Sequence, residues 1–185
     1  MKRDLFCKYI VGLYNDVPIE LYLGLISVFA IGLFLVLKFS NDKNHIRLAS
    51  KLLLIEYILL LFCSTVLFRT GNKDVKYSVE PLWSYESIQD GNSVLIAENF
   101  MNVVAFIPIG FLLGCSFRKN RLWKVILIGI CISAIVEGLQ LYFKRGFAEV
   151  DDVIHNTLGC IIGYGLYSLL RLGYKKVYKR RTAVC

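Results

Sequence analysis

The sequence predicts an all-α, polytopic transmembrane helix bundle that forms a single domain across its 185 residues. Hydrophobic residues make up 56% of the chain, and they gather in five apolar runs at residues 20–39, 52–68, 94–117, 125–143 and 153–174. Each run is close to the roughly 20 residues that an α-helix needs to cross a bilayer. A soluble domain seldom carries apolar runs of this length. The chain is therefore expected to be an integral membrane protein with about five membrane-spanning helices.

The distribution of Lys and Arg predicts how these helices are oriented. Basic residues dominate the segments between runs one and two and between runs three and four, and the tail at residues 175–185. The other two loops contain more acidic than basic residues. Because cytoplasmic loops are enriched in Lys and Arg, the basic segments and the C-terminus are expected in the cytoplasm and the N-terminus outside, although Lys2, Arg3 and Lys8 disagree with that N-terminal placement. The net charge of +8 thus follows the loops, and nucleic-acid binding is not expected.

The first part of the chain is predicted to anchor the protein. Residues 1–18 include an apolar run too short to span, and this leader is expected to form an interfacial helix. Run 20–39 shows no convincing cleavage site and is expected to be a retained helix. Run 52–68 forms the next helix, with Glu56 near its cytoplasmic end, and stops at Arg69. Glu56 is expected to reach the interface or to pair with a nearby lysine.

The longest connection, at residues 70–93, is predicted to lie over the outer end of the bundle. Tyr77, Trp83 and Tyr85 are amphipathic aromatic residues of the kind that sit at the membrane–water boundary. The connection is therefore expected to act as a lid or as an anchor. Asn92 or Ser93 supplies an N-cap for the following helix.

Each of the last three predicted spans carries polar residues on one face near its outer end. Residues three, four or seven positions apart share a face of an α-helix. The sets at this spacing are Glu98 with Asn102, Ser133 with Glu137 and Gln140, and Asp152 with Asn156. Together with Arg69 and Arg145, these residues predict one shared site at the extracytoplasmic face.

Glycines predict where helices approach one another closely. Gly110 with Gly114, and Gly159 with Gly163, form GxxxG pairs, which allow a second helix to pack at short distance. These faces are expected to serve packing within the bundle or to form a homo-oligomer. Pro108 is expected to bend its helix near the middle.

The predicted ligand-binding residues are polar side chains that hydrocarbon tolerates poorly and that usually mark a function. They are Arg69, Asn102, Glu137, Gln140, Arg145, Asp152 and Asn156. Arginine forks suit phosphate or carboxylate groups. Glu137 and Asp152 are candidate catalytic residues, because a carboxyl group in a partly apolar setting can act as a general acid or base.

Two other interpretations of these residues stay open. The amides and carboxylates can hold helices together, although such contacts contribute only about 0.6–2 kcal/mol each. Asp151 or Asp152 can cap the last helix. No metal or cofactor is expected, since the spacing of His155 and its acidic neighbours matches no metal motif and the six cysteines are scattered singly.

The order and spacing of these residues over positions 69–163 resemble the VanZ-like family of bacterial membrane proteins. The matching positions are Arg69, Pro81 with Trp83 and Ser84, Asn102 with Phe106, Pro108 and Gly110, Ser133 with Glu137 and Gln140, Arg145, Asp151 or Asp152 with Asn156, and Gly159 with Gly163. Of the two aspartates, Asp152 is taken to match the family's principal one. The resemblance implies a Gram-positive cell membrane and resistance to teicoplanin-type lipoglycopeptides, with no reaction attached to the family.

The expected function combines the resemblance with the outward-facing polar groups. An outer-leaflet pocket is expected to engage an anionic envelope amphiphile and to reduce sensitivity to teicoplanin-type lipoglycopeptides. The amphiphile would be a membrane lipid head group, a lipid-linked wall precursor or the antibiotic. The alternatives are a membrane-embedded enzyme that modifies a lipid head group or antibiotic with Glu137 or Asp152 as acid or base, a lipid transporter, and a scaffold that binds membrane partners.

Overall fold

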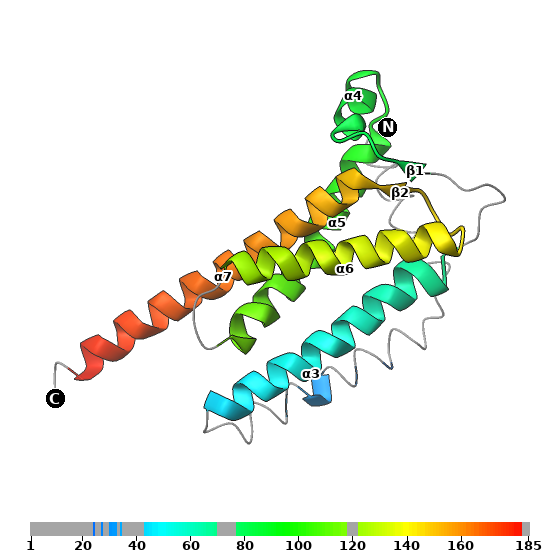
Figure 1. Ribbon diagram of the computed structural model, residues 1–185. Coiled ribbons are helices and arrows are strands. Elements are labelled where there is room, and N and C mark those ends of the chain that lie inside the picture. Colours follow the sequence, from blue (N-terminus) through cyan, green and yellow to red (C-terminus); the bar gives the residue numbers. More distant parts are fainter. Residues whose placement is uncertain are drawn as a thin grey trace.

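The structure is a computed structural model, and its long helices form a bundle (Figure 1). It describes residues 43–69, 77–117 and 122–182, together with single helical positions between residues 24 and 34. The predicted interfacial leader at residues 1–18, the N-terminal orientation and most of run 20–39 lie outside the described residues.

Four described helices are long and apolar enough to cross a membrane. They are α3 (Lys43–Phe62) continued by the π-helical turn η1 (Cys63–Leu67), α5 (Val94–Ser116), α6 (Leu122–Tyr142) and α7 (Val150–Thr182). The prediction of an all-α, polytopic membrane protein is therefore confirmed, and the figure of five spans is approximate.

Two of these helices extend beyond the apolar runs that predicted them. Helix α3 begins at Lys43 rather than at residue 52, and α7 continues to Thr182 rather than stopping at residue 174. The added turns are rich in basic residues. Hydropathy marks only the part of a helix that lies in hydrocarbon, whereas Lys and Arg are good helix formers that extend a helix into the polar interface.

The connection before α5 has a structure that sequence patterns did not indicate. It contains β1 (Tyr77–Ser78) and the short helix α4 (Trp83–Gln89), and β1 pairs in parallel with β2 (Ala148–Glu149) just before α7. Figure 1 shows α4 and this strand pair at the end of the bundle where α5 and α7 begin. Ser93 is the N-cap residue of α5, but its side chain makes no capping hydrogen bond.

Glycines bring the backbones of α5 and α7 together. A Cβ atom on Gly110 would lie 1.9 Å from the carbonyl oxygen of Cys160, and one on Gly163 would lie 2.0 Å from that of Ile107. Gly159 is similarly close to Val103. These glycines pack α5 against α7 within one chain, so a homo-oligomer would have to form through another surface. The homo-oligomer stays a prediction.

Candidate functional site

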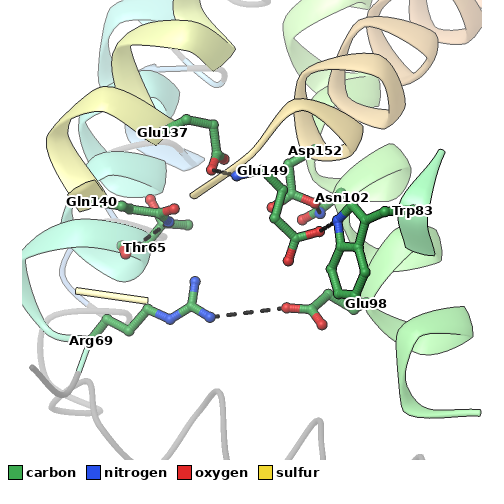
Figure 2. A network of polar contacts seen from close by, with 9 residues as sticks. All are labelled: Thr65, Arg69, Trp83, Glu98, Asn102, Glu137, Gln140, Glu149 and Asp152. Carbon is green, nitrogen blue, oxygen red and sulfur yellow. Dashed lines mark hydrogen bonds and ion pairs between the residues drawn. The ribbon is translucent and has the colours of Figure 1, made fainter. Parts of the chain in front are cut away.

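Polar side chains from separate elements face one another at the end of the bundle where α5 and α7 begin and where η1 and α6 end (Figures 1 and 2). Because all four spans contribute from this one end, the side chains belong to one side of the membrane. We call the following residues the polar cluster: Arg69, Glu98, Asn102, Glu137, Gln140, Glu149 and Asp152.

Asp152 and Asn102 form the part of the polar cluster that joins α7 to α5. The Asn102 Nδ2 donates to Asp152 Oδ1 at 2.6 Å. Asp152 is buried in the first turn of α7. The close glycine packing farther along α5 and α7 holds the two helices in this register. The pair therefore stands on the closely packed interface between α5 and α7.

Glu137 and Glu149 connect α6 to the strand pair. The backbone N–H of Glu149 donates to Glu137 Oε2 at 3.1 Å, and the Trp83 indole Nε1 donates to Glu149 Oε2 at 2.9 Å. Burial, followed by the negative charges of Asp152 and Glu98, raises the pKa of the Glu149 carboxyl from 4.5 to about 8, against the opposing effect of the Trp83 hydrogen bond. Glu149 thus holds its proton near neutral pH.

Arg69 brings a guanidinium group to these carboxyl groups. Its Nη2 lies 4.0 Å from Glu98 Oε1, at a more exposed edge of the cluster, with 32% and 22% of the two side chains exposed. The guanidinium also packs against Gly146, whose φ of +106° suits glycine. Figure 2 shows Arg69 and Glu98 reaching toward one another from opposite sides.

Gln140 and Asn156 each leave a buried oxygen without a partner among the described residues. Gln140 Nε2 donates to the carbonyl oxygen of Thr65 at 3.3 Å, in the π-helical turn η1, but its Oε1 has no hydrogen bond. One helical turn deeper than Asp152, Asn156 Nδ2 donates to Ser133 Oγ at 2.8 Å, and its Oδ1 is likewise unpartnered. π-Helical turns are frequent at functional sites.

Arg145, the second predicted anion-binding arginine, lies against backbone rather than against the carboxyl groups. Its Nη1 donates to the carbonyl oxygens of Leu67, at 2.5 Å, and Arg69, at 2.8 Å. The last carbonyl groups of a helix lack partners within the helix, and a cation there is favourable. Arg145 therefore holds the backbone that carries Arg69, while its predicted contact with a ligand stays a prediction.

The two adjacent aspartates at the start of α7 have different surroundings. Asp151 is fully buried and accepts hydrogen bonds from the backbone N–H groups of Leu82, at 2.5 Å, and Ser84, at 3.0 Å, and from Ser84 Oγ at 2.5 Å. It fixes the start of α4. Asp152 instead faces the polar cluster, which is the position that the sequence analysis assigned to the ligand-binding aspartate.

Helix α4 has a further attachment to α7, through Tyr85 and His155. The Tyr85 hydroxyl lies 2.9 Å from His155 Nε2. The connection is therefore anchored at several points, which agrees with the expectation that it lies over the end of the bundle.

Within the described parts of the chain, no group of three or more His, Cys, Asp or Glu residues could hold a metal ion.

The sequence placed Glu98 near the site and marked Trp83 as an interfacial aromatic residue and a family-matching position, but it did not indicate that Glu149, Trp83 and Gly146 belong to the site. Glu149 and Trp83 meet only because β1 and β2 pair, and strands of two residues leave no periodic pattern. The signal for Gly146 was its place next to Arg145 in a short loop, which alone does not identify Arg69 as its neighbour.

The chain is similar to a known protein family and to a single relative. The VanZ/LLP1 family model matches residues 23–171. Protein VanZ of Enterococcus faecium is 35% identical over 68 residues, which are 37% of this chain and 42% of that protein. The alignment thus spans less than half of the length of that relative. No solved structure matches the chain.

Proposed function

The chain belongs to the VanZ/LLP1 family, and we propose that its polar cluster engages the head group of an envelope amphiphile at the outer face of the membrane, thereby reducing sensitivity to teicoplanin-type lipoglycopeptides. The observation that carries this proposal is the convergence of buried carboxyl groups from α6, β2 and α7 on a site that Arg69 borders.

Packing alone is a poor reason to keep these groups. A charged side chain that is buried in a protein interior costs several kcal/mol of desolvation, whereas interhelical polar contacts return only about 0.6–2 kcal/mol. The hydrogen bonds from Asn102 to Asp152 and from Glu149 to Glu137 do tie elements together. They leave the carboxyl groups facing one another, however, and apolar residues would join the same helices at lower cost.

The position of the cluster favours an amphiphile as the ligand. The cluster lies at the ends of the membrane spans, the level of lipid head groups, and the exposed aromatic residues Tyr77 and Tyr85 belong to the same end. A ligand with an acyl chain can keep that chain in the bilayer while its head group reaches Arg69. Arg69 offers a forked donor for a phosphate or carboxylate group. A membrane lipid, a lipid-linked wall precursor and the antibiotic itself all fit this description.

Resistance would follow from occupancy of this site. The acyl tail of a lipoglycopeptide gives it affinity for the membrane surface. A protein that captures the antibiotic, or the amphiphile that the antibiotic meets there, lowers the effective concentration at that surface. The effect should be greater for a glycopeptide with a lipid tail than for one without.

The proposal is tested by expressing the chain in a teicoplanin-susceptible Gram-positive host. Wild-type protein should raise the inhibitory concentration of teicoplanin more than that of a glycopeptide without an acyl tail. Arg69→Gln should remove this protection. Lys144→Gln, which removes one positive charge from an exposed side chain in the neighbouring loop, should retain it. Immunoblots of membrane fractions check that the two variants accumulate equally. Equal protection by both variants, or none from the wild type, would contradict the proposal.

A second candidate function is acid–base chemistry on the head group, with Glu137 or Asp152 as acid or base. It is favoured by the proximity of both carboxyl groups to Glu149, which stays protonated near neutral pH and can donate a proton. Mass spectrometry of lipids and antibiotic after incubation with the purified protein separates the two functions. A covalently changed product supports catalysis, and unchanged material supports binding alone.

A further inference from the structure

We infer that the polar cluster takes a primary-ammonium group, and that its ligand is a zwitterionic amphiphile whose anionic group lies at Arg69. This inference rests on the proposed function and specifies the ligand class of the same site. It replaces the purely anionic amphiphile that the sequence predicted.

The polar cluster contains more acidic than basic residues. The polar cluster contains the carboxyl groups of Glu98, Glu137, Glu149 and Asp152, but Arg69 is its single basic residue. Arg145 is held by backbone carbonyl groups instead. A head group with negative charge alone would be attracted only at Arg69, because the ionised carboxylates repel it and the protonated Glu149 carboxyl offers it no positive charge. A head group that also carries a positive charge is attracted by the remainder of the site.

The hydrogen-bond donors in and around the cluster are already in use within the protein. The amide of Asn102, the indole of Trp83 and the backbone N–H of Glu149 donate to Asp152, Glu149 and Glu137, respectively. Each of these carboxyl groups thus accepts a hydrogen bond from the protein through one of its two oxygens. Apart from the proton on Glu149, what the site still offers to a ligand is acceptor oxygens, so the complementary ligand is rich in donors.

Gln140 also favours a ligand that donates hydrogen bonds, independently of the acidic residues. Its side chain is 4% exposed, its Nε2 is bound to the Thr65 carbonyl, and its buried Oε1 has no partner among the described residues. Figure 2 shows Gln140 beside Glu137, with the side chain pointing toward the carboxyl groups of Glu149 and Asp152. A buried acceptor without a donor is costly. An ammonium group has three N–H donors and can satisfy Gln140 and two carboxylates together.

The exposed edge of the cluster completes the zwitterionic arrangement. Arg69 and Glu98 are its more exposed members, and their 4.0 Å separation is a loose ion pair that a phosphate group can replace. The ammonium would lie deeper, between Glu137 and Asp152, both of which are buried. A head group with adjacent phosphate and ammonium groups matches this order from the edge inward.

The inference is tested with the purified full chain in detergent micelles. The probes are phosphatidylethanolamine, its N-acetyl derivative without the ammonium charge, phosphatidylglycerol, and tail-free phosphoethanolamine. Dissociation constants are measured by native mass spectrometry. Phosphatidylethanolamine should bind at least about tenfold more tightly than its N-acetyl derivative, a difference of about 1.4 kcal/mol. If tail-free phosphoethanolamine binds more weakly than phosphatidylethanolamine, the ligand is a lipid. If the two bind equally tightly, the assignment of an ammonium group stands, but the claim that the ligand is an amphiphile is overturned.

Variants show whether the preference comes from this site. Asp152→Asn and, as a second choice should it fail to fold, Glu137→Gln should bring the two dissociation constants close together. Asp90→Asn, at the exposed end of α4, should leave their ratio unchanged. If phosphatidylglycerol binds as tightly and Arg69→Gln removes that binding, the ammonium inference is wrong while the proposed function stands. Binding of no probe, or binding that requires added Mg²⁺, also overturns the inference. If Arg69→Gln leaves the dissociation constants of the probes unchanged, both the ammonium inference and the proposed function are contradicted.

Discussion

Gly146 fixes the position of the single guanidinium group in the polar cluster. Its φ of +106° is unfavourable for other residues, and a Cβ atom built there would lie 2.8 Å from Arg69 Cζ. We expect Gly146→Ala to displace Arg69 and to remove protection against teicoplanin, with a loss of about 1–2 kcal/mol in the free energy of unfolding from the backbone conformation. Inhibitory concentrations and thermal unfolding in detergent measure the two effects.

Gly138→Ala is the matched control for this prediction. Gly138 lies in α6, and nothing is found within 4 Å of a Cβ atom built there. Alanine is the better helix former by up to about 1 kcal/mol, so this variant should be at least as stable as the wild type and should retain protection. If Gly146→Ala behaves in the same way, the packing of Arg69 against Gly146 does not matter to the site.

Glu149 should make stability depend on pH. The pKa of its carboxyl is about 8 in the folded protein and ordinarily 4.5, so the folded state binds the proton more tightly than the unfolded state. Unfolding therefore releases a proton between these values, and the free energy of unfolding falls as pH rises from about 4.5 to about 8. The fall is up to about 1.4 kcal/mol per pH unit.

Thermal unfolding of wild type and Glu149→Gln between pH 5 and pH 9 checks this dependence. Gln keeps an oxygen for the Trp83 hydrogen bond but cannot ionise. The variant should gain stability relative to the wild type as pH rises, and the difference should level off above pH 8. A constant difference across the range would show that Glu149 is ionised throughout.

Residues of the candidate site could be predicted from the sequence where helical spacing places them on a common face. Asn102, Glu137, Gln140 and Asp152 were predicted to face one site because each lies on a regular helix with its polar partners at helical intervals. The position of Arg145 could not be predicted, because it depends on where the carbonyl groups at the end of η1 lie.

At the scale of secondary-structure elements, the α5–α7 interface makes the site possible by holding Asn102 against Asp152. Gly163 is central to it, because a Cβ atom there would lie 2.0 Å from the Ile107 carbonyl oxygen. We expect Gly163→Ala to force the helices apart and to lower the free energy of unfolding by about 1–3 kcal/mol or more. Thermal unfolding in detergent measures the loss.

Gly165→Ala tests the same substitution two residues farther along α7. Nothing lies within 4 Å of a Cβ atom at Gly165, so this variant should be as stable as the wild type. Equal stability of the two variants would mean that α5 and α7 do not pack backbone to backbone.

The elements that could be predicted are those determined by the local sequence rather than by contacts between distant residues. Long apolar runs determine the four described spans. Helix α4 and the β1–β2 pair depend instead on contacts between distant parts of the chain, such as the hydrogen bonds from Leu82 and Ser84 to Asp151. A seven-residue helix and two-residue strands are too short to leave a periodic signal of their own.

On the scale of the whole molecule, the polar cluster and the basic segments lie at opposite ends of the bundle. The cluster is formed where α5 and α7 begin, whereas the first turns of α3 and the last turns of α7 are basic. Because Lys and Arg mark the cytoplasmic side, the end with the cluster should face outward, where envelope amphiphiles and antibiotics arrive. An inward-facing cluster would be incompatible with the proposed function.

Cysteine labelling in intact cells tests this orientation in a cysteine-free variant that retains protection. Tyr77→Cys places a thiol on β1 beside the cluster, where the side chain is 61% exposed, and Lys176→Cys places one at the exposed basic end of α7. A maleimide that cannot cross membranes should label position 77 in intact cells and position 176 only after permeabilisation. The two thiols lie at opposite ends of the bundle, so the labelling pattern reports the direction of the four described spans. The reverse pattern would place the carboxyl groups in the cytoplasm and would exclude capture of an extracellular ligand.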